Sequence, residues 1–337
     1  MGAIGRPVTV SDVAALAEVS VGTASKALNG RGTLRPETRR RVREAAEQLG
    51  FQPSAAARAL RSGRSFTVGM ITTDSIGRFS IPIMRGVEDA LGAGRMSVLL
   101  CDARDDGIRE QYYLETLIGR RVDGIIMTGR RSQARPPISI SMPVPTVYAF
   151  ISSTGPADCS VVVDEAGGAR SAVEHLLALG RRRVVHVTGP ERHQSATARA
   201  DAMLATLADA GLRPVVPPMF GEWNETWGRQ AAGILLKSGQ DFDAVFCGSD
   251  QIARGLIGTL RAAGRVVPDD VAVVGFDNWD VMVLGCQPTL TSVDMDLEGL
   301  GRTAAQLLLA AIDGKPAPGL HVHRCELVVR ESTVGRP

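Results

Sequence analysis

Paired cysteines are missing from this sequence. Its five cysteines, Cys101, Cys159, Cys247, Cys286 and Cys325, are scattered along 337 residues and form no CxxC pair. An odd, scattered set fits neither a disulfide framework nor a zinc finger, and it favours a reducing compartment. No run of 18 apolar residues occurs, and residues 1–10 have no apolar segment of secretory length. We therefore expect a soluble, cytoplasmic protein without a membrane partner.

The common signatures of catalytic and nucleotide-binding sites are also absent. The sequence holds no GxSxG, HExxH, P-loop or GxGxxG. His175 and His186 lie on apolar helix and strand patterns, where a core histidine is the simpler interpretation. His321, His323 and Cys325 alternate along an expected strand and would share one face, a spacing that could bind a metal, but no fourth ligand is visible. We predict no enzyme activity, no cofactor and no metal site.

Charge is unevenly distributed along the chain. The net charge is +2, yet residues 1–65 contain eleven Lys and Arg against five Asp and Glu, which gives +6 there and −4 in the rest. Such asymmetry is typical of a basic segment that meets a polyanion, attached to a mildly acidic body. A basic face that is merely solvated is the alternative that charge alone leaves open.

Three short helices are predicted within residues 8–52. Thr9 is suited to cap the first helix, with a capping-box partner three residues later, and apolar residues follow at helical spacing. Ser20 can cap a second helix after a turn of about three residues. Pro36 fits the first turn of a third, which Gly50 ends. This pattern predicts a helix-turn-helix domain, a DNA-binding unit.

Residues 53–65 form an alanine-rich stretch that Ser54 could cap as a short helix. About nine helical residues are too few to be stable alone in water. A flexible linker therefore remains the alternative to a helix that forms only on binding.

From residue 66 onward, short apolar runs alternate with helical segments. The expected strands are 68–71, 98–101, 123–127, 184–187, 244–247 and 271–275, and the expected helices are 83–91, 110–118, 167–179, 195–210, 226–237, 251–263 and 300–312. This alternation is typical of α/β folds with parallel sheets and right-handed crossovers. The length of residues 66–337 suits two doubly wound subdomains side by side.

Several segments together carry a family resemblance. VTVSDVAALAEVSVGTASKALNG, RPETRRRVREAAEQLGF and PSAAARALRSGRS resemble the head and hinge of the lactose-repressor family. VDEAGGARSAVEHLLALGRRRVVHVTGP, SDQIARGL, VPDDVAVVGFDN, PTLTSVD and LVVREST resemble its periplasmic-binding-protein-like body. The resemblance implies a head at 8–52, a hinge at 53–65 and an effector-binding, dimerising body at 66–337. We expect an N-subdomain at about 66–163 and 293–321, and a C-subdomain at about 164–290 and 322–337.

The resemblance also implies which residues meet DNA. In that family the second helix enters the major groove, and hinge helices enter the minor groove of a pseudo-palindromic operator. The expected base-reading positions are Val21, Gly22 and Lys26, with Thr23 and Ser25 beside them. Lys26 can donate to guanine, whereas Val21 and Gly22 offer apolar or backbone contact, although Gly22 could simply pack. The residues suited to phosphate contacts are Thr9, Ser20, Asn29 and Thr38.

The hinge carries its own expected contacts. Leu60 matches the leucine that the family wedges into the central base step, and Ala57 matches the small residue beside it. Ser54 and Arg58 complete the expected set. An ordinary core leucine is disfavoured because the neighbouring residues are basic.

Polar residues follow the expected strands of the body, where ligands of parallel sheets lie. They are Asp74, Arg130, Ser249, Asp250 and Asp277, and the resemblance adds Arg199 and Trp223. Phe79, from the first loop of the body, completes the expected effector-binding set. An arginine and several carboxylates suit vicinal hydroxyls, and tryptophan suits the apolar face of a sugar ring. Asp250 could instead cap the helix that follows it, and Trp223 could be a core residue.

Two departures from the family weaken the sugar assignment. Met295 stands where sugar-binding members often carry a polar side chain, and the first loop, TTDSIGRFSIPI, contains Phe79 as its only aromatic residue. A less polar effector, or one of another shape, stays open.

We interpret the chain as a homodimeric, allosteric transcription factor that represses its targets and responds to a small effector, a sugar or a sugar derivative. The sequence ends soon after LVVREST without a leucine-heptad tail, which favours a dimer over a tetramer. An enzyme and a sugar-binding protein for transport are the alternatives, and the second would leave the basic head unexplained.

Overall fold

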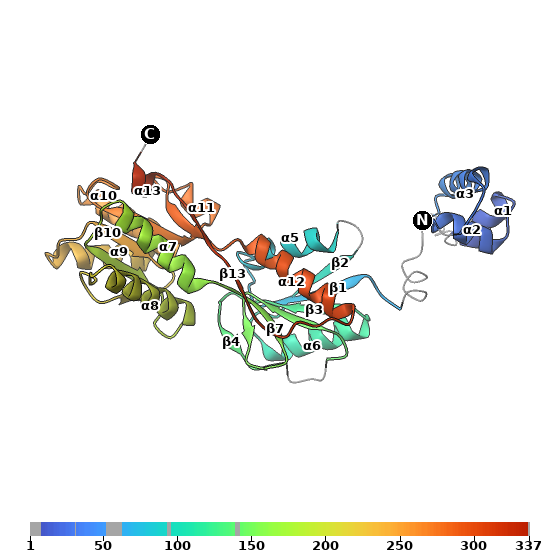
Figure 1. The fold of residues 1–337 in the computed structure, drawn as a ribbon, viewed down its shortest axis with the longest axis horizontal. Helices are drawn as coiled ribbons and strands as arrows, with labels where there is room; N and C mark the ends of the chain where they lie inside the picture. Colours follow the sequence, from blue (N-terminus) through green and yellow to red (C-terminus); the bar gives the residue numbers. More distant parts are fainter. Residues whose placement is uncertain (1–7, 31, 52–62, 93–95, 139–141, 336–337) are drawn as a thin grey trace, which may run out of the picture. The chain divides into compact units, whose positions relative to one another are not determined.

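The computed structural model describes residues 8–30, 32–51, 63–92, 96–138 and 142–335 (Figure 1). The chain divides into two compact units, residues 1–65 and residues 66–337, here called the head and the body. Among the described residues, no helix is both long and apolar enough to span a membrane.

The head contains three helices, at the positions that the sequence predicts. They are α1 (Val10–Leu16), α2 (Val21–Leu28) and α3 (Pro36–Gln48). Thr9 and Asp12 form the expected capping box at α1, Ser20 caps α2 by accepting the amide of Thr23, and Pro36 opens α3. Local capping chemistry thus sets where each helix begins.

A small aliphatic core holds these helices together. Its buried residues are Val13, Ala14, Ala17, Ala24, Ala27, Val42, Ala45 and Ala46. Most of them are alanines, whose small side chains allow the three helices to pack closely around a core of limited volume. The helix-turn-helix prediction is confirmed.

The body contains two six-stranded sheets, as the doubly wound prediction requires. The first has the order β13-β7-β5-β3-β1-β2, and the second has the order β14-β12-β11-β10-β8-β9. All neighbours pair in parallel except β12 and β14. The first sheet contains β1 (Thr67–Thr72), β2 (Ser97–Asp102), β3 (Gly124–Met127), β5 (Thr146–Ala149), β7 (Cys159–Val163) and β13 (Gly319–His323). The second contains β8 (Val184–Thr188), β9 (Met219–Phe220), β10 (Ala244–Cys247), β11 (Ala272–Asp277), β12 (Thr291–Asp294) and β14 (Glu326–Val328).

Helices cover both sheets. On the first sheet they are α5 (Ser80–Leu91), α6 (Gly107–Gly119) and α12 (Leu297–Ile312); on the second they are α7 (Glu165–Ala178), α8 (Gln194–Asp209), α9 (Glu225–Lys237) and α10 (Asp250–Ala262). The short elements are β4 (Ala134–Arg135), β6 (Ser152–Ser153), α11 (Asp280–Val283) and α13 (Glu331–Val334). Alternation along β1 explains the layering, since Val68 and Met70 pack in one core cluster while Ile71 packs with α6 residues in another.

The chain passes three times between the two sheets. It leaves the first sheet after β7, returns to it after β12 and leaves it again after β13. The N-subdomain segments therefore run to Val163 and from about Leu297 to His323. This shifts the expected boundaries at 293 and 321 by a few residues, because Val293 and Asp294 pair within the second sheet and His323 still pairs in the first.

Candidate functional site

The head presents one face of α2 to solvent. Val21 is 50 % exposed, and Gly22 and Lys26 are exposed as well, whereas Thr23 and Ser25 are half-buried. Val21, Gly22 and Lys26 are therefore accessible to a partner. These are the residues that the sequence assigns to base reading.

The expected phosphate-binding residues lie at the ends of the helices. The hydroxyl of Thr9 is 2.7 Å from Asp12 Oδ2, and the side-chain amide of Asn29 donates to the carbonyl of Ser25 at 2.5 Å. Ser20 is exposed and Thr38 is half-buried in the first turn of α3. The hinge residues Ser54, Ala57, Arg58 and Leu60 lie outside the described residues, so their assignment stays a prediction.

A cavity of about 370 Å³ opens in the body where strands of both sheets end. The residues that line it are Arg78, Phe79, Arg130, Arg131, Ser132, Phe150, Glu165, Arg192, His193, Ser195, Arg199, Glu222, Trp223, Ser249, Asp277 and Met295. Six of the eight predicted effector residues are among them. The rule that ligands lie beyond the carboxyl ends of parallel strands therefore locates the cavity.

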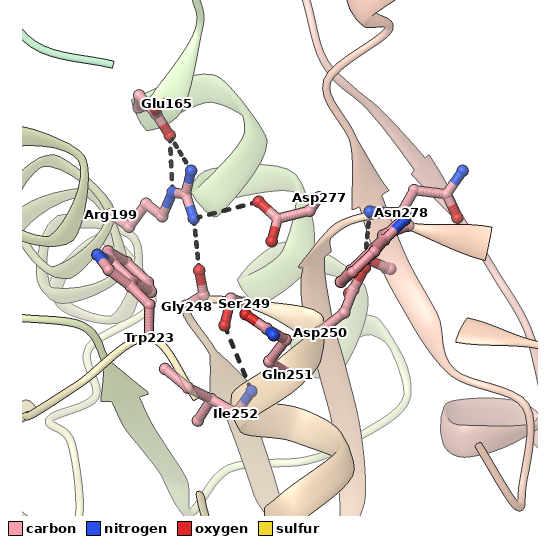
Figure 2. A network of polar contacts seen from close by, with 12 residues as sticks. Glu165, Arg199, Trp223, Gly248, Ser249, Asp250, Gln251, Ile252, Asp277 and Asn278 are labelled. Carbon is pink, nitrogen blue, oxygen red and sulfur yellow. Dashed lines mark hydrogen bonds and ion pairs between the residues drawn. The ribbon is translucent and has the colours of Figure 1, made fainter. Parts of the chain in front are cut away.

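Arg199 is the centre of a buried charge network (Figure 2). Its Nε and Nη2 both lie close to Glu165 Oε2, at 2.7 and 2.6 Å, and its Nη1 lies 3.9 Å from Asp277 Oδ1. Nη1 also donates to the carbonyl oxygen of Gly248. The guanidinium stacks 3.5 Å above the ring of Phe276. The two carboxylates compensate a cation that burial alone would destabilise, and the pKa of Arg199 is raised above its ordinary value although burial acts the other way.

Asp277 joins a second arginine from the other sheet. Arg78, in the loop between β1 and α5, is ion-paired with Asp277 through Nη2, and its Nη1 donates to Gln251 Oε1 at 3.2 Å. Its guanidinium also lies 4.6 Å from the ring of Trp279. Since β1 belongs to the first sheet and the other three residues follow strands of the second, Arg78 ties the two subdomains together beside the cavity.

Aromatic side chains form the apolar walls. Phe79 stacks on Phe150 with ring centroids 4.9 Å apart. Trp223 donates through Nε1 to His193 Nδ1 at 2.8 Å, and it is half-buried, with one part of the indole packed against the core cluster of the second sheet. It lies over Gly189, where a Cβ atom would come within 2.1 Å of the indole, so only glycine fits there. Met295, predicted as a departure from the family, also lines the cavity.

Two predicted effector residues do not line the cavity. Asp74 Oδ2 accepts the amides of Phe79 and Ser80 at 2.7 and 3.0 Å, so its carboxylate serves the first turn of α5. Asp250 is fully buried; it accepts from Ser292 Oγ and from the amide of Trp279. Burial and the neighbouring Asp277 raise the pKa of Asp250 to about 8. Both aspartates organise the backbone around the cavity instead of facing it.

Arg130 and Ser249 both line the cavity but differ in how exposed their side chains are. Ser249 is buried and accepts the amide of Ile252 at 3.3 Å, which caps α10. Arg130 is half-exposed and lies 3.8 Å from Asp105. Of the two, Arg130 has the more exposed side chain and is the more accessible to a ligand.

Sequence reasoning missed Arg78, Glu165, Arg131, Arg192 and His193. Arg78 directly precedes Phe79 in the first loop of the body, and Glu165 opens a helix directly after a strand. The position of Glu165 at a strand end was a usable signal. Arg192 and His193 form a basic pair directly before α8, and this pair at the start of an expected helix is the sequence pattern that could have identified them.

The histidines outside the cavity have structural partners. His186 is fully buried against Phe246, and burial lowers its pKa to about 4. His321 contacts the carbonyl of Ala317 and His323 contacts Asp296, so the side chains near β13 do not converge. No group that could hold a metal ion occurs among the described residues.

Comparison with known proteins identifies both parts of the chain. Residues 9–54 match the model of the bacterial regulatory proteins of the lacI family, and residues 173–333 match that of a periplasmic binding protein-like domain. The chain is 30 % identical to the ribose operon repressor of Halalkalibacterium halodurans, over 97 % of each chain. It is 33 % identical to the transcriptional regulator CelR of Thermobifida fusca, over 96 % of this chain and 98 % of that one.

Solved structures show the same architecture. The lac repressor dimer bound to operator and an anti-inducer superposes with a TM-score of 0.80 at 26 % identity, covering 98 % of this chain and all of that one. A complex of CelR with cellobiose gives a TM-score of 0.66 at 31 % identity, covering 97 % of this chain. These relatives regulate transcription and are not enzymes, and transport proteins would lack the matched head. The chain therefore belongs to the lacI family of bacterial regulatory proteins.

Proposed function

We propose that this protein is a repressor that binds a pseudo-palindromic operator as a homodimer and is controlled by a small effector, a sugar or a sugar derivative. The observation that carries the proposal is the combination of an exposed reading face on α2 with a polar cavity in the body of the same chain. A head alone would suffice to bind DNA, and a cavity alone would suffice to bind a ligand.

The reading face supports recognition in the major groove. Val21, Gly22 and Lys26 are exposed on one helix, where Lys26 can donate to guanine O6 and N7 and Val21 can meet a thymine methyl. Arg40, Arg41 and Arg43 are exposed on α3 and add positive charge for phosphates. A dimer would place two such helices on the two halves of a palindrome, and the lac repressor, a relative in structure, binds its operator as a dimer.

The cavity supports a small polar ligand. Its volume of about 370 Å³ lies near the lower end of the roughly 300–1,000 Å³ typical of ligand pockets. Guanidinium and carboxylate groups can bond hydroxyls, while Trp223 and the Phe79–Phe150 stack offer apolar faces. The cellobiose held by CelR and the ribose operon controlled by another relative favour a sugar.

The charge network suggests how the effector would act on DNA binding. Asp277 contacts both Arg78 from the first subdomain and Arg199 from the second. An effector that bonds these groups differently in two arrangements of the subdomains would shift the population between them. That difference in affinity is the coupling between cavity and operator.

Selection from a random DNA pool with the full-length protein tests the proposal. We expect the selected DNA sequences to share a two-fold symmetric consensus that the protein binds as a dimer. We also expect the affinity for this DNA to change when a sugar that raises the melting temperature of the protein is added. Asp277→Ala should retain operator binding and lose the effector response, because losing a charge-assisted bond costs about 1.5–3 kcal/mol, or one to two decades of affinity.

Glu174→Ala is the matched control, since Glu174 is an exposed carboxylate on α7 that does not line the cavity, and it should change neither operator binding nor the effector response. Recovery of no consensus would contradict the DNA-binding part of the proposal. An Asp277→Ala protein that responds like the parent would contradict the effector part.

A further inference from the structure

The cavity has an excess of positive charge that its own carboxylates do not balance. Five arginines line it, against the three carboxylates of Glu165, Glu222 and Asp277. Glu165 is committed to Arg199, and Asp277 is committed to Arg78. The unbalanced cations are therefore the other three arginines, Arg130, Arg131 and Arg192, here called the arginine rim.

The members of the arginine rim lie together around His193. Together with burial, Arg131, Arg192 and Arg130 lower the pKa of this imidazole, while Glu222 opposes them. Arg130 and Arg131 share a single partner, Asp105, at 3.8 and 3.5 Å. Within the described part of the chain, Arg192 has no ion pair. One shared carboxylate and one exposed glutamate thus face three guanidinium groups.

Helix α8 reinforces this positive region. It spans the 16 residues Gln194–Asp209, its N-cap residue His193 makes no side-chain cap hydrogen bond, and its first turn contains no acidic residue. Ser195 in that turn lines the cavity. The amides at the start of a long helix carry partial positive charge and favour an anion.

Deeper in the cavity, a carboxylate oxygen needs a hydrogen-bond donor. Glu165 is 8 % exposed, and both of its contacts with Arg199 use Oε2. Its other oxygen, Oε1, is buried and has no hydrogen-bond partner among the described residues. A buried carboxylate oxygen without a donor is costly, so this atom is suited to accept a hydrogen bond from a ligand hydroxyl.

We propose that the effector is an anionic sugar derivative, with a hydroxyl on Glu165 Oε1 and a phosphate or carboxylate group at the arginine rim. Arginine pairs with both of these anions through two parallel hydrogen bonds. The inference rests on the proposed function, since it gives the chemical class of the ligand for the same cavity.

Calorimetric titration of the full-length protein with matched sets tests this. Each set contains a neutral sugar, its terminal phosphate and its aldonic acid. The hexose set is glucose, glucose 6-phosphate and gluconate, and the pentose set is ribose, ribose 5-phosphate and ribonate. Inorganic phosphate is titrated alone. We expect at least one anionic sugar to bind about tenfold or more tightly than its neutral parent, and inorganic phosphate to bind more weakly than that sugar.

Arg192→Gln and Arg131→Gln are the informative variants, because neither side chain is buried. Each should weaken the anionic sugar about three- to tenfold and leave the neutral parent unchanged. Arg120→Gln, an exposed arginine at the end of α6, removes the same charge away from the cavity and should change neither affinity.

The phosphate and acid arms distinguish the two sources of the anion. The proposal would be overturned if only neutral sugars bind or if no anionic sugar binds. It would also be overturned if Arg192→Gln and Arg131→Gln leave the affinity for the anionic sugar intact. A neutral sugar that alters operator binding would overturn the anionic ligand and leave the proposed function standing. An anionic sugar that binds without changing the affinity for operator DNA would overturn the effector part of the proposed function and leave the anionic ligand standing.

Discussion

Replacing Glu165 by alanine tests the energetics of the buried charge network. Glu165 and Arg199 are 8 % and 4 % exposed, and the substitution would leave the guanidinium without its nearest carboxylate. Removing one partner of a buried ion pair costs about 3–5 kcal/mol. Arg199 would keep the Gly248 carbonyl and Asp277 Oδ1 at 3.9 Å, so we expect a loss at the lower end, about 3 kcal/mol.

Calorimetric melting of the full-length protein measures this loss. For a unit of this size, 1 kcal/mol corresponds to roughly 2–4 °C, so the transition of the body should fall by about 6–12 °C. Glu222→Ala removes an exposed carboxylate of the same cavity and should change stability by less than about 0.5 kcal/mol. A transition of the Glu165→Ala protein within one degree of the parent would refute the argument, because it would mean that Arg199 is not stabilised by this pair.

Three further outcomes concern the head and hinge. Thr9→Ala removes the capping box of α1 and should destabilise the head by about 1 kcal/mol, measured by helix content on heating, whereas the exposed Ser11→Ala should have little effect. Operator affinity measured by fluorescence anisotropy should fall about 10³–10⁵-fold between 50 and 200 mM salt if six to ten phosphates are contacted, and a flat response would contradict the phosphate contacts. Leu60→Ala should weaken binding to operator and spare scrambled DNA if Leu60 is a minor-groove wedge; equal losses on both DNAs with a lower melting temperature would identify it as a packing residue.

Local chemistry made the helices of the head predictable. The caps at Thr9 and Ser20 and the proline at the start of α3 involve residues within three or four positions of one another. The apolar runs of the body were equally informative, and they correspond to β1, β2, β3, β8, β10 and β11. The strands β5 (TVYA) and β12 (TSVD) were missed because polar residues interrupt their apolar pattern, whereas the equally short β3 (GIIM) and β10 (AVFC) are apolar throughout.

The cavity was predictable in position but only partly in its residues. The rule for strand ends places Asp74, Asp250 and Asp277 at the carboxyl ends of strands in the two sheets, yet it does not say which carboxylate turns back to accept hydrogen bonds from nearby backbone amides. The ion pairs that complete the site join residues far apart in the chain: Arg78 lies 199 positions from Asp277, and Glu165 lies 34 positions from Arg199. Such pairings depend on the tertiary fold, and no local pattern in one sequence encodes them.

The three passages between the sheets have a consequence for synthesis on the ribosome. The edge strand β13 and the covering helix α12 of the first sheet are translated after nearly all of the second subdomain. Until they emerge, the nascent first sheet exposes the edge of β7 and the apolar surface that Leu300, Ala304 and Leu308 later cover. An open strand edge beside uncovered apolar surface invites misassociation. Ribosome stalling late in the message would thus endanger the earliest part of the body.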